Sequence, residues 1–182
     1  VEIAQEIAKR IGVKAQFVLD EGLAVIADDP ITHRRVALIG TAEKGYGTLM
    51  VTARAEGGHS SAPPADGGGV ATLARAVTAI AERGYPMRFS GPGAAMVSAL
   101  AAKGTFPVRM AAANLWLFRP LLIRQIGATL DRNSLLHTTI APTMLQGSPK
   151  ENVLPQDATA WINYRFAPGD TAWSAIGRAQ KA

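Results

Sequence analysis

Apolar and polar residues alternate along parts of this chain in ways that predict its secondary structure. Residues 46–55 alternate strictly, which predicts a strand with one apolar face. Residues 158–166 predict a second such strand, on which Asn163 and Arg165 share the polar face. Across residues 70–81 the apolar positions recur at helical spacing instead, so an amphipathic helix is expected between the two strands.

Two further strands complete the predicted sheet. Residues 35–41 have β-like character, and a hairpin around residues 43–45 is expected to join them to the strand at 46–55. Residues 138–145 regain strand character, and Pro142 favours the sheet edge because proline cannot donate a backbone hydrogen bond. The pattern therefore predicts an α+β fold: a four-stranded antiparallel sheet with helices on one face.

The segments between and after these strands are predicted to be mostly helical. Residues 86–135 fit two or three short helices, broken at Gly91-Pro92, Gly104 and Pro120. Asp170 is expected to cap a last helix, which is still open where the chain ends.

The amino-terminal residues differ in pattern from the rest. Residues 2–11 predict a helix, and residues 15–19 predict a buried strand that ends in Asp20-Glu21. This order is typical of the edge of an α/β domain, to which residues 1–22 are expected to belong. Residues 23–33 are polar and rich in turn-forming residues, and are expected to form a linker.

Composition narrows the possible chemistry. The chain has 182 residues and no cysteine, which excludes disulfides, a thiolate zinc site and a cysteine nucleophile. No apolar run approaches the ~18 residues that a membrane-spanning helix needs. Because the absence of cysteine fits the cytosol and the periplasm equally well, no compartment is assigned.

The net charge of +5 is concentrated in one segment. Residues 83–132 contain seven Lys and Arg residues and a single acid, Asp131. Such a segment can attract nucleic acid, a membrane surface or another anionic partner. However, the cations stand singly among apolar residues, as on solvated helix faces, and no regular aromatic residues offer stacking for bases. No nucleic-acid partner is therefore expected, and a basic α+β nucleic-acid-binding module is the alternative interpretation.

Two clusters in the first half of the chain contain candidate metal-binding or catalytic residues. Asp20 and Glu21 follow a strand, where α/β enzymes hold metals and substrates, although a solvated acidic turn fits as well. In the stretch GGHSSAPP, residues 57–64, glycines allow a ligand to approach and His59 could act as a base or donate to an oxyanion. An ordinary glycine-rich loop is the alternative, because neither a nucleophile elbow nor metal-ligand spacing accompanies His59.

A third cluster combines a loop with a strand. Asn152 lies in the stretch SPKENVLP, residues 148–155, and offers amide donors from a tight loop. Arg165 has the planar guanidinium that binds a carboxylate through two parallel hydrogen bonds. A solvated or structurally paired arginine fits the same pattern.

The clusters also occur in a distinctive order. Six stretches, spread over nearly the whole chain, follow one another in this order: FVLDEG, IGTAEKGY, GGHSSAPP, NLWLF, TMLQGSPKENVLP and NYRFAPGD. In this order they resemble the di-zinc aminoacylase and carboxypeptidase family, most of all its carboxypeptidase S and N-acyl-amino-acid hydrolase branch. Members of that family have a zinc-binding catalytic domain interrupted by a smaller lid, or dimerisation, domain.

The resemblance implies a division of the chain. Residues 34–166 would form a ferredoxin-like lid domain with a helical insert at 83–132. Residues 1–22 would be the end of the first catalytic segment, joined to the lid by the linker at 23–33. Residues 167–182 would return towards the catalytic domain.

The resemblance also implies roles for four residues. Glu21 would bind zinc, and His59 would reach a substrate carbonyl, often in the partner subunit's site. Asn152 corresponds to the asparagine of the lid loop and Arg165 to the arginine that holds the substrate's carboxylate, and the two together would fix the free carboxylate of the amino acid. The substrate would be a peptide or an N-acyl amino acid, two zinc ions would act in the full-length enzyme, and a homodimer could form through the lid.

Most of the family's catalytic residues have no counterpart in this sequence. The first zinc histidine, the bridging aspartate, the paired glutamates and the final zinc histidine are missing, whereas a catalytic zinc needs about three protein ligands. We therefore expect a fragment of a longer enzyme, as the start at Val1 also suggests. Alone, it is expected to bind no zinc tightly and to be inactive.

Overall fold

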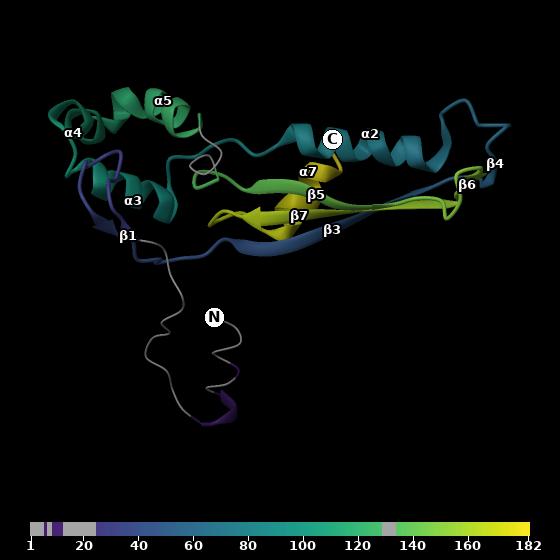
Figure 1. Ribbon diagram of the computed structural model, residues 1–182, viewed down its shortest axis with the longest axis horizontal. Coiled ribbons are helices and arrows are strands. Elements are labelled where there is room, and N and C mark those ends of the chain that lie inside the picture. Colours follow the sequence, from purple (N-terminus) through teal and green to yellow (C-terminus); the bar gives the residue numbers. More distant parts are fainter. Residues whose placement is uncertain (1–5, 7–8, 13–24, 129–133) are drawn as a thin grey trace.

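A three-stranded antiparallel sheet and a group of helices occupy opposite parts of an elongated molecule (Figure 1). The computed structural model describes residue 6 and residues 9–12, 25–128 and 134–182. The predicted strand at 15–19 and Glu21 lie outside the described residues, as does most of the helix predicted at 2–11.

The sheet is built around its central strand. Its strands, in spatial order, are β3 (Gly45–Arg54), β7 (Asp157–Phe166) and β5 (Thr139–Gln146). Both pairings are antiparallel, and β3 pairs with β7 over its full ten residues. The register of β5 shifts at a bulge between Pro142 and Met144. Its place at the sheet edge confirms the expectation from Pro142.

In the part of the chain that the structure describes, the sheet has three strands rather than the four predicted. The segment expected at 35–41 contains only β2 (Val36–Ala37), which pairs with β1 (Val25–Ile26) and not with β3. The predicted hairpin around residues 43–45 is therefore wrong, and the predicted linker contains a strand. Asp29 explains the local pairing: its buried carboxylate accepts a hydrogen bond from the backbone N–H of Thr32 at 2.8 Å, which closes a turn between β1 and β2.

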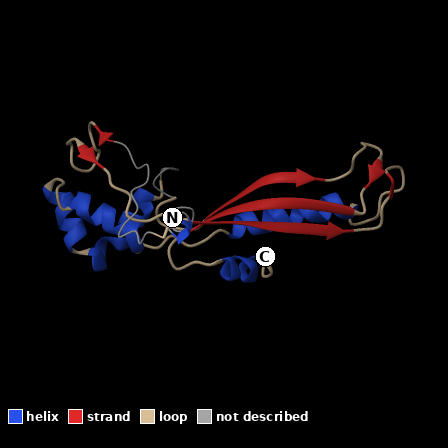
Figure 2. Cartoon of the chain, turned by 90° about the horizontal axis from the view of Figure 1, so that it is seen from below, coloured by secondary structure: helices blue, strands red, loops and turns tan. Residues whose placement is uncertain are grey.

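The core lies between one face of the sheet and two helices, α2 (Gly68–Arg83) and α7 (Ala172–Ala179). Figure 2 shows the long α2 running beside the strands. Every second residue of β7 is buried on this face: Ala158, Ala160, Ile162, Tyr164 and Phe166. From α2, Leu73, Val77 and Ile80 pack against them, which confirms the predicted amphipathic helix. Val70, at the start of the predicted apolar stripe, is exposed instead.

A helical group stands between α2 and β5 in the chain. Its helices are α3 (Gly91–Ala101), α4 (Phe106–Ala113) and α5 (Leu115–Ile126). This confirms the predicted short helices, but Pro120 lies inside α5, where it removes one backbone donor without ending the helix. Within the described ranges, no helix is both long and apolar enough to cross a membrane.

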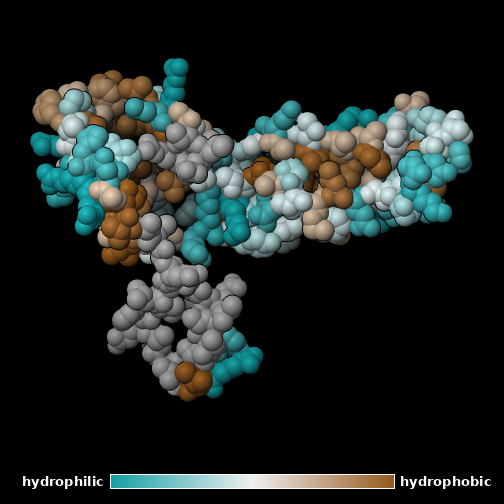
Figure 3. Space-filling model, in the orientation of Figure 1, coloured by the Kyte–Doolittle hydropathy of each residue, from teal (hydrophilic) through white to brown (hydrophobic). Residues whose placement is uncertain are grey.

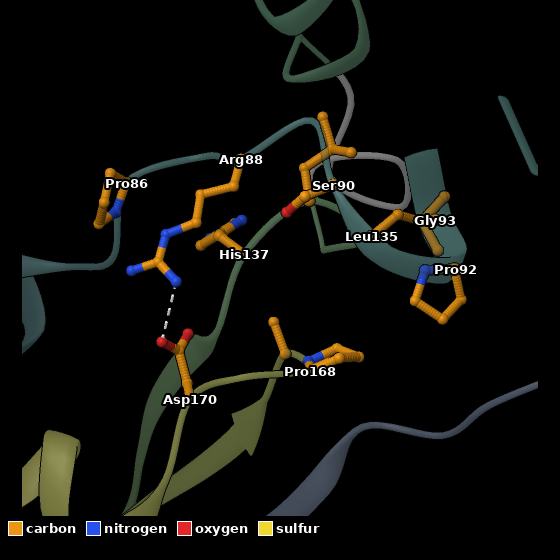
Figure 4. Close-up of a pocket in the computed structure, with 11 residues that line it drawn as sticks. Pro86, Arg88, Ser90, Pro92, Gly93, Leu135, His137, Pro168 and Asp170 are labelled. Atoms are coloured by element: carbon orange, nitrogen blue, oxygen red, sulfur yellow. Dashed lines mark hydrogen bonds and ion pairs between the residues drawn. The ribbon is translucent and has the colours of Figure 1, made fainter. Parts of the chain in front are cut away.

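Asp170 joins the segment that leads into α3 to the segment that leads into β5. Its side chain is 8% exposed and accepts a hydrogen bond from Thr138 Oγ1 at 2.6 Å. It also accepts one from Arg88 Nη1 at 3.2 Å, which Figure 4 shows. The expectation that Asp170 caps the last helix is wrong, because Thr171 is the N-cap of α7 and accepts from the backbone N–H of Ser174. The carboxylate instead forms an ion pair with Arg88 and a hydrogen bond with the buried hydroxyl of Thr138.

A separate two-stranded ribbon lies at the far end of the sheet from the helical group (Figure 1). It consists of β4 (Gly58–His59) and β6 (Val153–Leu154), paired antiparallel. We call it the β4–β6 ribbon.

Candidate functional site

The β4–β6 ribbon brings together two of the residues singled out from the sequence. His59 ends β4, and Asn152 immediately precedes β6. The backbone N–H of Ser60 donates to the carbonyl of Asn152 at 3.1 Å. The two loops are thus joined directly beside both candidate side chains, although 93 residues of chain separate them.

Close packing in the ribbon requires glycine at position 57. A Cβ atom there would lie 2.9 Å from Gln156 Cγ and 3.1 Å from the Leu154 carbonyl oxygen. At Gly58 the added Cβ would meet only the Leu154 side chain, at an ordinary 3.9 Å. The first glycine of GGHSS therefore lets the chain approach itself, which fixes the base of the loop that carries His59.

The environment of His59 sets the position of its proton. Its Nδ1 lies 2.8 Å from Ser61 Oγ and 3.2 Å from the Ser61 backbone nitrogen. Because a backbone N–H can only donate, Nδ1 accepts, and the neutral imidazole carries its proton on Nε2. The exposed ring therefore offers an N–H donor, the group needed to stabilise negative charge on a carbonyl oxygen.

Arg165 lies at the other end of β7, on the sheet face that the helices leave open. Its guanidinium carbon is 4.8 Å from the centroid of the Tyr46 ring, on the paired strand. Asn163 shares this face, which confirms the predicted alternation, and its Nδ2 donates to the Gly47 carbonyl at 3.3 Å.

The ribbon and Arg165 are widely separated within one chain. Arg165 stands eight residues after Asp157 in an extended strand, which corresponds to about 26 Å. The ribbon lies beyond Asp157, away from Arg165 (Figure 1). The structure thus brings His59 and Asn152 together and leaves Arg165 apart from them, so Asn152 and Arg165 of one chain do not meet at a single carboxylate as expected.

Two supporting residues were not identified from the sequence. Tyr46 contacts Arg165 only through the register of β3 on β7, which the sequence does not reveal. Ser61 was seen only as part of a glycine-rich stretch, but its position two residues after His59 is a local signal, because short side chains at that spacing bond back to the ring.

The described residues do not provide a zinc site. Among them, no three His, Asp or Glu side chains lie close enough together to hold a metal ion. Glu21, the expected zinc ligand, lies outside the described residues. Since a catalytic zinc needs about three protein ligands, no zinc-dependent step can be derived from these residues. That the chain alone binds no zinc tightly stays a prediction.

Comparison with known proteins places the chain in a family. The sequence profile of the peptidase dimerisation domain matches residues 41–182. The N-fatty-acyl-amino acid synthase/hydrolase PM20D1 of Xenopus tropicalis is 41% identical over 174 residues, which covers 92% of this chain and 34% of the relative. The human protein of the same name is 37% identical over 163 residues, covering 88% and 32%.

A more distant relative supports the same placement. The probable carboxypeptidase S-like 2 of Dictyostelium discoideum is 32% identical over 158 residues, covering 86% of this chain and 30% of the relative. The chain thus spans about a third of the length of the relatives it matches. The expected kinship with carboxypeptidase S and the N-acyl-amino-acid hydrolases is confirmed: this chain belongs to the peptidase dimerisation domain family, the lid domain of M20 peptidases.

Proposed function

We propose that this chain is the lid and dimerisation part of a zinc-dependent amidohydrolase or exopeptidase, and that it completes active sites across a homodimer. Several relatives are named N-fatty-acyl-amino acid synthase/hydrolase, so the first substrate class we propose is N-fatty-acyl amino acids, with peptides second. The separation of the β4–β6 ribbon from Arg165 is the observation that supports action across two copies.

The distances within such a substrate are short. In an N-acyl amino acid, the carboxylate and the amide carbonyl oxygen lie within roughly 5 Å of each other. About 26 Å of strand separates Arg165 from Asp157 in one chain, and His59 lies farther on. If Arg165 binds the carboxylate and His59 binds the carbonyl oxygen, the two residues must come from different copies.

Each side chain has the chemistry for its proposed role. The Arg165 guanidinium offers paired N–H donors to a carboxylate, and stacking on Tyr46 restricts its motion. His59 offers its Nε2–H to the carbonyl oxygen as negative charge develops there, and Asn152 adds amide donors from the joined loop. The two zinc ions would belong with Glu21 and residues of the longer enzyme, so this chain alone would be inactive.

The topology of the strands and helices supports a ferredoxin-like lid and indicates which sheet edge could form the dimer contact. The order β3-α2-β5-β7-α7, with the helical group inserted after α2, reproduces five elements of the β-α-β-β-α-β motif. We propose that a strand following α7 in the longer enzyme completes the sheet beside β3. The edge of β5 would then pair with a second copy, and its exposed Met144 and Leu145 would be covered there.

Kinetics of the full-length enzyme test the proposed roles. His59→Ala should lower kcat on an N-acyl amino acid by at least about tenfold while leaving the unfolding midpoint unchanged. Arg165→Ala should mainly raise KM, whereas Arg54→Ala, an exposed arginine on the same open face, should change neither constant. Near-normal kcat in the His59 variant would remove it from the mechanism.

Sedimentation tests the proposed dimer contact. The isolated chain should sediment as a dimer, and Leu145→Glu should convert it to a monomer. The matched control is Leu117→Glu, which changes an exposed leucine of the helical group and should leave the dimer intact. A monomeric wild-type chain would contradict dimerisation through this domain.

A further inference from the structure

The helical group surrounds an apolar cavity that is open on one side. Its volume is about 480 Å³, within the range of small-molecule sites. Its walls include Val97 of α3, Ala111 of α4, and Phe118 and Leu122 of α5. Ile31, from the turn between β1 and β2, also lines it, so an element outside the helical group contributes to the wall.

Two of the three helices around this cavity are poor in buried residues. Neither α4 nor α5 contains a single fully buried side chain, although both are rich in large apolar residues. Figure 3 shows apolar side chains gathered at the surface of this part of the molecule. Apolar residues that face an open cavity instead of a core are typical of a ligand or partner site.

The helical group that forms most of the cavity carries charge of one sign, whereas Asp29, next to the lining residue Pro30, is buried and accepts a hydrogen bond from Thr32. Residues 84–128 contain no Asp or Glu, and their cations are Arg88, Lys103, Arg109, Arg119 and Arg124. Three of these cations adjoin lining residues in the sequence and are themselves exposed: Arg109, Arg119 and Arg124. An apolar cavity in a helical group whose charges are all positive favours a ligand with a hydrocarbon tail and an anionic head over a neutral lipid.

We propose that this cavity binds the hydrocarbon chain of a single-chain anionic amphiphile, either a long-chain N-acyl amino acid or the fatty acid released from it. The inference rests on the proposed amidohydrolase function and assigns the binding of the acyl chain to the helical group. The position of Arg165 agrees with this, because β7 runs with its Arg165 end towards the helical group (Figure 1). The apolar walls hold the chain, the cations of the helical group attract anionic ligands in general, and Arg165 is left to bind the carboxylate of an N-acyl amino acid.

Direct binding to the 182-residue chain tests this proposal without any catalytic readout. The probe is cis-parinaric acid, a fluorescent 18-carbon fatty acid, displaced by palmitate or by N-palmitoylglycine. Ala111→Trp, which fills the cavity, should weaken probe binding by at least about tenfold. Ala113→Trp, an exposed position of the same helix that does not line the cavity, should leave binding within about twofold. A circular dichroism melt confirms that both variants are folded.

A charge variant separates the contribution of the anionic head group to binding from that of the hydrocarbon tail. Replacing Arg109, Arg119 and Arg124 together with glutamine should weaken the competition by palmitate while leaving that by its neutral methyl ester unchanged. Equal loss of probe binding in the Ala111 and Ala113 variants, or no binding by the wild-type chain, would overturn the proposal. Binding of the chain to phosphatidylserine vesicles would also overturn it, if that binding requires the exposed Trp116 and is unchanged by Ala111→Trp. Such a result would show that the helical group binds a membrane surface instead of a single amphiphile.

The full-length enzyme distinguishes failure of this inference from failure of the proposed function. Ala111→Trp should lower kcat/KM for N-palmitoyl amino acids and leave that for N-acetyl amino acids unchanged. Hydrolysis of both substrates with no effect of the variant would refute the acyl-chain site alone. A different outcome is that palmitate binds the wild type and not the variant while the wild-type enzyme hydrolyses neither substrate. That result would support the acyl-chain site and refute the proposed function.

Discussion

The guanidinium of Arg165 stacks on the ring of Tyr46, with 4.8 Å between its central carbon and the ring centroid. The pairing of β3 with β7 places the two residues opposite each other on the open face of the sheet. Stacking holds the guanidinium plane while its edge N–H groups stay available for a carboxylate. Tyr46 is therefore a positioning residue for Arg165.

Replacement of Tyr46 should affect substrate affinity more than turnover. An exposed cation–π contact is worth about 0.5–1 kcal/mol, so Tyr46→Leu in the full-length enzyme should raise KM about two- to fivefold at unchanged kcat. Tyr46→Phe keeps the ring and should keep the KM. Equal KM values for the leucine and phenylalanine variants would show that the ring does not position Arg165.

The proton of neutral His59 should lie on Nε2. The Ser61 backbone N–H donates to Nδ1 at 3.2 Å, which leaves Nε2 as the protonated nitrogen. Nitrogen chemical shifts of the imidazole, measured by NMR well above its pKa, identify the tautomer directly. Ser61→Ala retains the backbone donor and should give the same tautomer, whereas a proton on Nδ1 in the wild-type chain would contradict the geometry.

Asp170 should contribute strongly to the stability of the fold, whereas Asp157, which also lies near an arginine, should contribute little. Asp170→Ala removes the acceptor of Thr138 and of Arg88 in a largely buried place, and should lower the free energy of unfolding by about 1–3 kcal/mol. Asp157 lies 3.9 Å from Arg54, with both side chains exposed, so Asp157→Ala should change it by less than about 0.5 kcal/mol. Urea unfolding measures both free energies, and similar losses in the two variants would show that the contacts of Asp170 with Thr138 and Arg88 add no special stability.

Tyr164 should make the folded chain sensitive to alkaline pH. Burial, reinforced by Tyr85 and opposed by Arg178, raises the pKa of Tyr164 above its ordinary value of 10.0. The unfolded chain then ionises first, so this stabilisation is complete below pH 10 and is lost as pH rises through 10 to the folded pKa. Burial lowers the pKa of Lys44, which makes stability rise with pH in the alkaline range. The effect of Tyr164 must therefore be isolated with a variant of that residue.

The comparison is between wild type and Tyr164→Phe. The free energy of unfolding of the wild type should fall more steeply above pH 10 than that of the variant, and tyrosine absorbance should show one of the three tyrosines ionising last. Parallel stability curves for the two proteins would contradict the raised pKa.

The long elements could be predicted from the sequence, and the short ones could not. β3, β7 and α2 each repeat their apolar spacing over ten or more residues, so that both the element and its buried face are evident. The predicted pairing of residues 35–41 failed because β2 has only two residues, and the turn at Asp29 determines its partner. A two-residue strand has no periodicity to read.

The same limit applies to the candidate site. His59, Asn152 and Arg165 could be picked out by residue type and order, but their distances depend on β4 and β6, which also have two residues each. The cavity of the helical group was not predicted either, because it depends on how three helices pack rather than on the spacing within any one of them.

Mixing two impaired variants of the full-length enzyme, assayed at a substrate concentration well below KM, tests most directly whether His59 and Arg165 act in one site from different copies. A dimer of one His59→Ala subunit and one Arg165→Ala subunit has one site in which both residues are intact. After subunit exchange at equal concentrations, about a quarter of the wild-type activity should return, because half of the dimers are mixed and each has one working site. If the mixture is no more active than its components while native electrophoresis shows that mixed dimers have formed, the two residues do not act across the dimer.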